Sequence, residues 1–144
     1  MKAVYVSRRE PDGPGTLARR SVRHVMSSPV VCVTADAAPA DALRAMLRRR
    51  HRHVVVIDGF GHCLGVLADR AVAAAWAHDP DLLEHGRVAA LLEPSPATVG
   101  KSARVVDAAR LMREGGVDAV AVVNDSGHPV GILTGTDLIA LLAR

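Results

Sequence analysis

Aromatic side chains are scarce in this sequence. They make up 2% of the 144 residues, which leaves Tyr5, Phe60 and Trp76 as the whole set. A core must therefore be built from aliphatic side chains and methionine, and recognition by stacking bases on aromatic rings is disfavoured. Hydrophobic residues still account for 49% of the chain, so a folded protein with a sizeable core is expected.

Cysteines and long apolar runs are also few. Cys32 and Cys63 show no CxxC spacing, which argues against a disulfide framework, and Cys32 is expected as a small buried strand residue. No apolar run reaches the roughly 20 residues that a membrane-spanning helix needs, and the first residues lack the apolar core of a signal peptide. These absences predict a soluble, cytoplasmic protein without a membrane partner.

Positive charge is modest overall but locally concentrated. The net charge is +3, with arginines gathered in residues 8–20 and 44–52. Such clusters attract anions, although a solvated helix face is their commoner explanation. Nucleic acid is a weak candidate partner, because the net charge is small and aromatic residues are rare.

An internal repeat organises the chain. At an offset of 66 positions, residues 22–72 align with residues 88–138 without a gap, and the match includes a Gly-His turn and a following glycine. Each copy predicts a short strand, an amphipathic helix, a β-branched strand, a hairpin to a third strand, and a closing helix. The expected strands are residues 30–33, 54–57 and 64–67, then 97–99, 120–123 and 130–133; the closing helices are residues 69–77 and 137–144.

The repeat predicts an α+β fold of two β-α-β-β-α units. We expect a flexible basic arm at residues 1–20, a first unit at 21–79, a linker at 80–85, and a second unit at 86–144. The last helix is apolar over most of its girth, more than one sheet face can cover. A second burying surface, and hence a homodimer, is expected.

The segment at residues 131–138, Gly-Ile-Leu-Thr-Gly-Thr-Asp-Leu, carries candidate binding chemistry. A helix is expected to begin near Thr136 or Asp137, and the unpaired N–H groups at its start favour an anion. Gly135 allows close approach to the backbone, and Asp137 could accept hydrogen bonds from a ribose diol. A plain helix cap by Thr134 or Thr136 remains the alternative interpretation.

The two units resemble a tandem pair of CBS motifs, the regulatory module named after cystathionine β-synthase. The resemblance rests on residues 26–31, 41–50 and 53–58, and above all on residues 131–138, which are similar to the family signature G-h-x-[TS]-x-x-D-h. It implies a pseudo-twofold disc with clefts between the motifs. Such clefts can bind AMP, ADP, ATP or S-adenosylmethionine, and such modules commonly form dimers.

The resemblance also implies a division of the site between the copies. Basic residues at positions like Arg52 and His53 reach phosphates in nucleotide-binding members, while Asp137 and Thr134 would hold the ribose. Gly135 and Thr136 complete the expected set of ligand-binding residues. The first copy departs from the signature, because Ala68 and Ala71 stand where Thr134 and Asp137 stand in the second. One cleft is therefore expected to be disabled, with at most one adenine nucleotide bound per chain.

Function is therefore expected to be regulatory, not enzymatic, with no required cofactor and no metal. The sequence shows no HxxxH or CxxC metal pattern, P-loop or catalytic triad order. The leading hypothesis is a sensor of an adenosine-containing ligand that acts on an unidentified effector protein. A ligand-free scaffold that works by protein–protein association is the alternative, and a nucleic-acid binder is the third.

Overall fold

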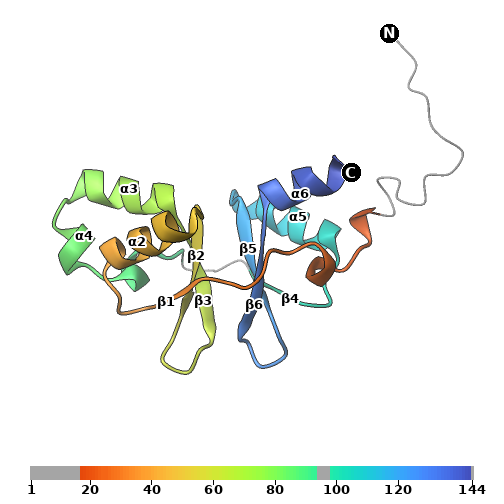
Figure 1. Ribbon diagram of the computed structural model, residues 1–144, viewed down its shortest axis with the longest axis horizontal. Helices are drawn as coiled ribbons and strands as arrows, with labels where there is room; N and C mark the ends of the chain where they lie inside the picture. The colour runs from red at the N-terminus through yellow and green to blue at the C-terminus, as the bar shows by residue number, and fades with distance from the viewer. Residues whose placement is uncertain (1–16, 94–97, 144) are drawn as a thin grey trace, which may run out of the picture.

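The computed structural model describes residues 17–93 and 98–143 and consists of two similar halves (Figure 1). The first half contains η1 (Val22–His24), β1 (Cys32–Thr34), α2 (Pro39–Arg49), β2 (His53–Ile57), β3 (Cys63–Ala68) and α3 (Asp69–His78). Two short helices connect the halves, α4 (Leu82–His85) and η2 (Val88–Leu91). The second half contains β4 (Thr98–Gly100), α5 (Val105–Gly115), β5 (Ala119–Val123), β6 (Pro129–Thr134) and α6 (Gly135–Leu142).

Each half forms its own three-stranded sheet. The first strand pairs with the second in parallel, and the second pairs with the third in an antiparallel hairpin, giving the orders β1-β2-β3 and β4-β5-β6. The registers repeat at the offset found in the sequence, since Val33 pairs with Val56 and Val99 with Val122. The pairing irregularity near the end of each hairpin recurs at the same place. The expected α+β fold with a duplicated β-α-β-β-α unit is confirmed.

The amphipathic helices cover the sheets with equivalent residues. In α2, Ala42 and Met46 are buried, and their counterparts Ala108 and Met112 are buried in α5. They pack on the β-branched middle strands, whose valines are almost fully buried. A core made from Val, Ala, Leu and Met follows directly from the shortage of aromatic residues.

The segment that leads into each sheet packs on the other half. Val22 is fully buried in the core of the second half, and its N–H donates to the carbonyl of Ala103 at 2.8 Å. Val88 is buried in the core of the first half, and its N–H donates to Ala37, also at 2.8 Å. Residues 21–27, expected in the first unit, therefore pack on the second.

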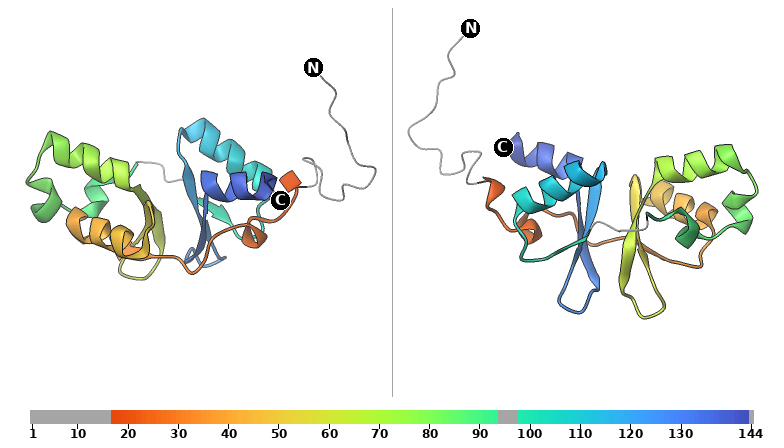
Figure 2. Two further views of the ribbon diagram at one scale, coloured as in Figure 1. Left: turned by 45° about the horizontal axis from the view of Figure 1, so that its top comes forward. Right: turned by 180° about the vertical axis from the view of Figure 1, so that it is seen from behind.

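The two hairpins lie side by side at the centre, with their turns pointing away from the helices (Figures 1 and 2). At these turns the ring of His62 stacks on that of His128, with centroids 5.1 Å apart, and the N–H of Cys63 donates to Gly127 at 2.9 Å. The equivalent of Cys63 in the second half is Pro129, which has no N–H to return the bond. The pseudo-twofold symmetry is broken at this point.

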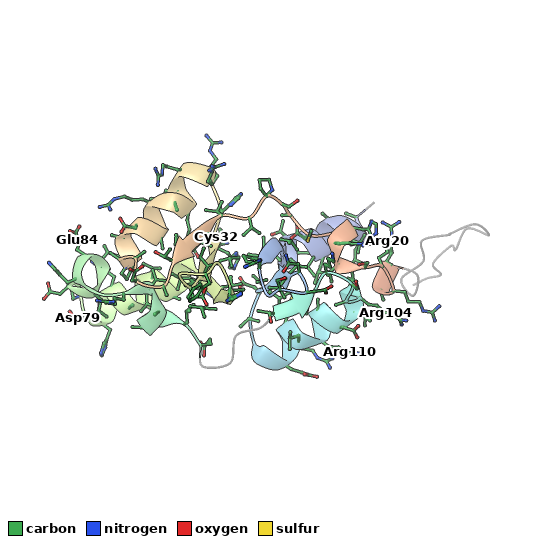
Figure 3. All side chains as sticks on the ribbon, turned by 90° about the horizontal axis from the view of Figure 1, so that it is seen from below. Arg20, Cys32, Asp79, Glu84, Arg104 and Arg110 are labelled. Atoms are coloured by element: carbon green, nitrogen blue, oxygen red, sulfur yellow. The ribbon has the colours of Figure 1, made fainter. Side chains whose placement is uncertain are left out.

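Some details differ from the sequence prediction. Helix α6 begins at Gly135, because Thr134 caps it, whereas a start near Thr136 or Asp137 was expected. Cys32, expected to be buried, is exposed at the start of β1 (Figure 3). Residues 1–16 of the expected arm lie outside the described residues; Leu17, near the end of that arm, packs against the core of the second half.

Both sheet-covering helices end in a left-handed residue. Gly116 follows α5 with φ +63°, and Arg50 follows α2 with φ 56°. Glycine adopts this conformation without steric cost, whereas a Cβ makes it unfavourable. The second half therefore uses the residue that suits the turn, and the first half accepts strain to keep an arginine.

Adjacent glycines are expected to respond in opposite ways to alanine. Gly116→Ala should lower the free energy of unfolding by about 1 kcal/mol, because nothing lies within 4 Å of the added Cβ and only the backbone is strained. Gly115→Ala lies inside α5 and should leave stability unchanged or raise it by up to about 1 kcal/mol. Denaturant unfolding of both variants measures this, and equal losses would contradict it.

Candidate functional site

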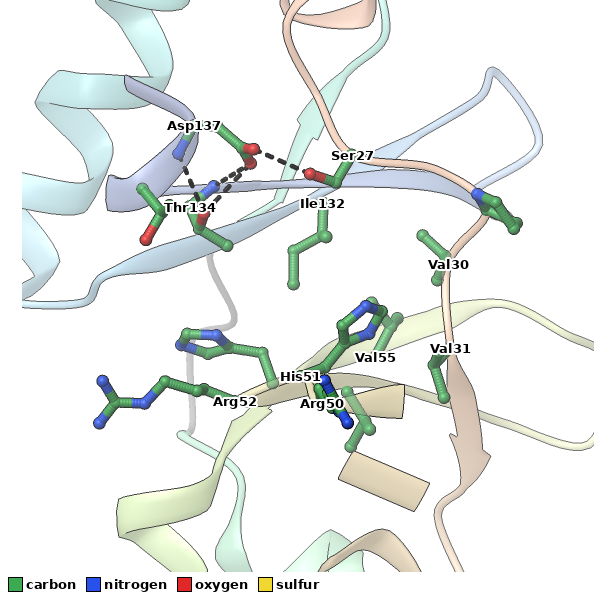
Figure 4. A pocket seen from close by; sticks show the side chains of 14 residues that line it. Ser27, Val30, Val31, Arg50, His51, Arg52, Val55, Ile132, Thr134 and Asp137 are labelled. Carbon is green, nitrogen blue, oxygen red and sulfur yellow. Dashed lines mark hydrogen bonds between the residues drawn. The ribbon is translucent and has the colours of Figure 1, made fainter. Parts of the chain in front are cut away.

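A cleft of about 300 Å³ lies between the two halves, and we call it the first cleft (Figure 4). Its lining comes from three segments: the extended chain before β1, the connection from α2 into β2, and the end of β6 with the start of α6. The lining residues are Ser27, Pro29, Val30, Val31, Arg50, His51, Arg52, His53, Val54, Val55, Ile132, Thr134, Thr136 and Asp137.

A backbone bridge holds the first of these segments in place. The N–H of Ser27 donates to the carbonyl of Ile132 at 2.8 Å, and the N–H of Ile132 donates back to Ser27 at 3.0 Å. This pairing adds the chain before β1 to the edge of β6, which belongs to the other half. Residues far apart in the sequence thereby form one wall of the cleft.

Asp137 caps α6 and also faces the cleft. Its Oδ2 accepts hydrogen bonds from the N–H of Thr134 at 2.9 Å and from the Thr134 hydroxyl at 3.1 Å, while its own N–H donates to Thr134 Oγ1 at 3.3 Å. Its Oδ1 accepts a hydrogen bond from Ser27 Oγ at 2.8 Å (Figure 4). The cap considered from the sequence is thus realised, with Thr134 as the capping residue, and it fixes a carboxylate at the cleft wall.

The opposite wall is basic. The left-handed turn at Arg50 ends α2 and leads through His51 and Arg52 into β2, so these side chains gather at the mouth of the cleft (Figure 4). Arg52 is largely exposed and its Nε donates to Asp69 Oδ2 at 3.4 Å. The cleft therefore sets arginine side chains across from the Asp137 carboxylate.

His53 is the most enclosed of the basic residues. Its side chain is 13% exposed, and its Nε2 lies 3.0 Å from Asp118 Oδ1 in the second half. A guanidinium nitrogen of Arg70 lies 3.6 Å from the same oxygen. Partial burial raises the pKa of the Asp118 carboxyl, but the hydrogen bond and charge of His53, together with Arg70, outweigh this and bring the pKa below its ordinary value. Asp118 is therefore ionised at neutral pH.

The structure brings five of the six expected site residues to the first cleft: Thr134, Thr136, Asp137, Arg52 and His53. Gly135 is not among the lining residues, and its N–H donates to the carbonyl of Asp118 at 3.0 Å. Sequence reasoning missed Ser27 and Ile132 as site residues. Their place depends on the bridge between segments about 100 residues apart, for which the sequence holds no local signal.

A second cleft of about 380 Å³ lies at the pseudo-symmetric position. It is lined by His53, Val66, Leu67, Ala68, Arg70, Ala71, Ala74, Leu91, Glu93, Gly116, Val117, Asp118 and Ala119. Ala68 and Ala71 occupy the places of Thr134 and Asp137, as the offset of 66 requires, and Asp118 occupies the place of Arg52. His53 lines both clefts.

Within residues 17–93 and 98–143, no three histidine, cysteine, aspartate or glutamate side chains gather into a group that could hold a metal ion. No helix there is both long and apolar enough to cross a membrane.

Comparison with known proteins places this architecture. A family model described as the CBS domain matches residues 22–78 and again residues 88–144. A CBS domain-containing protein of Dictyostelium discoideum is 27% identical over 132 residues, which cover 85% of this chain and 91% of that protein. An uncharacterized protein of Methanocaldococcus jannaschii is 26% identical over 108 residues, 75% of this chain and 25% of that protein.

Solved structures of CBS domain pairs have the same fold. The pair from protein MJ0100, in complex with 5′-methylthioadenosine and S-adenosyl-L-methionine, has a TM-score of 0.77 at 20% identity and covers 86% of this chain and 96% of that one. The CBS domain protein PAE2072 of Pyrobaculum aerophilum, complexed with AMP, has a TM-score of 0.75 at 23% identity, with coverages of 87% and 100%. CBSX2 in complex with AMP has a TM-score of 0.71 at 27% identity, with coverages of 85% and 96%. With two family matches in tandem and this fold, the chain belongs to the CBS domain family.

Proposed function

We propose that this protein is a regulatory module that binds one adenosine-containing ligand, such as AMP, ADP, ATP or S-adenosylmethionine, in the first cleft. One observation carries the proposal: the Asp137 carboxylate and a row of basic side chains from Arg50 to His53 face the same cleft between the CBS motifs. The neighbours crystallised with AMP, or with S-adenosylmethionine and 5′-methylthioadenosine, support this class of ligand. CBS pairs generally regulate rather than catalyse.

Each part of such a ligand has a matching part of the cleft. Val30, Val31, Val55 and Ile132 offer an apolar surface for the adenine. The ribose hydroxyls would donate to the Asp137 carboxylate and replace the hydrogen bond that Ser27 donates to its Oδ1. Thr134 and Thr136 line the cleft with further hydroxyl groups. The open space around Gly135 keeps the start of α6 uncrowded.

The phosphates belong on the basic wall. Arg52 and His53 are paired with Asp69 and Asp118, so phosphate binding would exchange one anionic partner for another. Because Asp69 begins α3 and Asp118 lies between α5 and β5, this exchange changes contacts in both motifs. A ligand that stabilises one set of these ion pairs would shift the arrangement of the two motifs relative to each other. This shift would transmit ligand binding to an effector protein.

Replacing Asp137 with alanine should weaken binding of AMP roughly tenfold or more, because two charge-assisted hydrogen bonds from the ribose are lost. The same change removes the cap of α6 and should lower stability by about 1 kcal/mol. Calorimetric titration at a temperature where the variant is folded measures the affinity.

The matched control is Asp107→Ala. Asp107 accepts the N–H of Arg104 at the start of α5, in the same position of the helix, and lies outside both clefts. It should lose comparable stability and keep the parent affinity for AMP. If the two variants bind AMP equally well, or if the parent titrates with two equivalent AMP sites, the assignment to Asp137 is wrong. If the parent binds none of the four ligands, the scaffold hypothesis replaces the sensor.

Replacing Arg52 with alanine should weaken ATP and ADP more than adenosine, because the lost guanidinium acts on phosphate charge. Raised salt should reproduce part of this loss in the parent protein. Arg48→Ala is the control, since Arg48 is exposed on α2 but does not line the first cleft. Equal losses for adenosine and ATP in the Arg52 variant would contradict a phosphate contact.

We further propose that two chains associate through their closing helices. Leu141 of α6 is buried within the chain, but Ile139 and Leu142 are 69% and 67% exposed. Trp76 of α3, at the position equivalent to Leu142, is 52% exposed, so both closing helices present apolar surface. This unsatisfied apolar surface supports the homodimer expected from the sequence.

Light scattering at low micromolar concentration should give twice the 15.1 kDa of one chain. The double substitution Ile139→Glu and Leu142→Glu should give the monomer, because charges would be buried without partners. Phe60→Glu is the control, since Phe60 is 83% exposed on a hairpin turn that points away from the helices. A monomeric parent would exclude the dimer.

A further inference from the structure

The C-terminal part of α2 and the connection that follows it form a dense basic surface. The arginines within residues 44–52 are all exposed: Arg44, Arg48, Arg49, Arg50 and Arg52. Nitrogen-tipped side chains stand out from this helix into solvent (Figure 3). We use the name α2 patch for the exposed surface formed by Arg44, Leu47, Arg48, Arg49 and Arg50.

Most of the positive charge in the α2 patch has no partner within the protein. Arg44 lies 3.1 Å from Asp41. Within the described ranges, the guanidinium groups of Arg48, Arg49 and Arg50 make no hydrogen bond or ion pair. The dipole of α2 favours positive charge in its last turn, but Arg44 and Arg48 are four positions apart, a spacing at which like charges on a helix repel. These arginines are therefore available to carboxylates from outside the chain.

The second copy shows that the fold does not need this charge. Helix α5 buries the equivalent residues and covers its sheet in the same way. The counterparts of the five arginines are, in chain order, Arg110, Glu114, Gly115, Gly116 and Asp118. Arg50 moreover adopts a left-handed conformation with φ 56°, which the glycine of the second copy adopts without steric cost. The charge on α2 therefore serves something other than the stability of the motif.

An exposed apolar side chain lies within this basic surface. Leu47 is 70% exposed and shares a helix face with Arg44 and Arg48, because residues three and four positions apart, or adjacent to such a pair, line one side of a helix. The counterpart of Leu47 in α5 is Arg113, so the frame accepts a charged residue at this position. A leucine flanked by arginines fits a partner that offers both carboxylates and an apolar side chain.

This combination favours a peptide over a nucleic acid. A phosphate backbone would use the arginines but gain little from Leu47. Unstacked bases are held chiefly on aromatic rings, and α2 contains no phenylalanine, tyrosine or tryptophan.

We propose that the α2 patch docks an acidic peptide segment of a partner protein, with an apolar side chain of that segment against Leu47 and its carboxylates against Arg44 and Arg48. The inference deepens the proposed function, because it states the chemistry of the effector. It rests on that function in one respect: Arg50 and Arg52 also line the first cleft, so the phosphates of a bound ATP would draw on the same arginines and weaken docking.

Fluorescence anisotropy of the full chain with a labelled peptide that repeats Glu-Glu-Leu-Glu tests the docking surface without any nucleotide. The protein should bind this peptide, and should bind the same peptide with alanine in place of leucine more weakly. Arg48→Glu should weaken binding of the leucine peptide roughly tenfold, because an attraction becomes a repulsion. Leu47→Ser should weaken the leucine peptide severalfold and leave the alanine peptide unchanged.

The control is Arg110→Glu, the same charge reversal at an exposed residue of α5, which should bind both peptides as the parent does. No binding of the leucine peptide, or equal losses in the Arg48 and Arg110 variants, would overturn the inference. Tighter binding of single-stranded DNA or of phosphatidylserine vesicles than of the peptide, with no effect of Leu47→Ser, would also overturn it.

A competition experiment connects the patch to the first cleft. Saturating ATP should weaken binding of the leucine peptide, and adenosine, which lacks phosphates, should not. Unchanged peptide binding in a sample that calorimetry shows to be loaded with ATP would contradict the shared use of Arg50 and Arg52. If none of the adenosine-containing ligands binds, the proposed function fails alone, because docking of the peptide is measured without nucleotide.

Discussion

The pairing of Ser27 with Ile132 is the contact on which both the architecture and the first cleft depend. It joins the chain before β1 to the last strand of the other motif through two backbone hydrogen bonds of 2.8 and 3.0 Å. It also sets Ser27 Oγ against Asp137, at the start of α6. One short bridge therefore determines where the apolar wall, the carboxylate and the basic turn after α2 stand relative to one another.

The segment before each sheet packs into the core of the other motif, and we call this arrangement crosswise packing. Because of it, the two motifs cannot be treated as independent halves. Val22 completes the core of the second motif and Val88 that of the first, with equivalent hydrogen bonds to Ala103 and Ala37. Removing either motif would leave one core without a fully buried valine and the other with an unpaired segment. The two clefts therefore lie between bodies that are already tied together, so the proposed ligand would contact both motifs at once.

Duplication has allowed the two clefts to diverge on a common frame. The turn after α5 uses Gly116, which is suited to its left-handed conformation, while the turn after α2 keeps Arg50 in the same conformation beside the first cleft. Two residues further along, Arg52 in the first copy is the counterpart of Asp118 in the second. Arg52 pairs with Asp69, whereas Asp118 pairs with His53. The strands and registers stay the same because they carry the core, whereas the cleft walls differ at Arg50, Arg52, Ala68 and Ala71 and their counterparts.

The sequence predicts the frame well because local patterns determine it. Runs of valine mark the middle strands, and their repetition at one offset predicts the paired sheets that the structure contains. The six predicted site residues come from contiguous motifs, and the one that does not line the cleft, Gly135, is the first residue of α6. The place of Ser27 in the first cleft could not be predicted, because a serine in a connecting segment carries no periodic signal. The pairing of Ser27 with Ile132 shows it.

Backbone NMR of the labelled protein titrated with AMP tests the central claim most directly. If the nucleotide binds between Asp137 and the basic turn, amide shifts should move first at residues 131–137 and 50–55, and the equivalent residues 65–71 and 116–121 should move little. Equal shifts at both sets would mean that AMP binds in both clefts, which contradicts the assignment to the first cleft alone. No shift at either set, at AMP concentrations in the millimolar range, would contradict nucleotide binding in the first cleft.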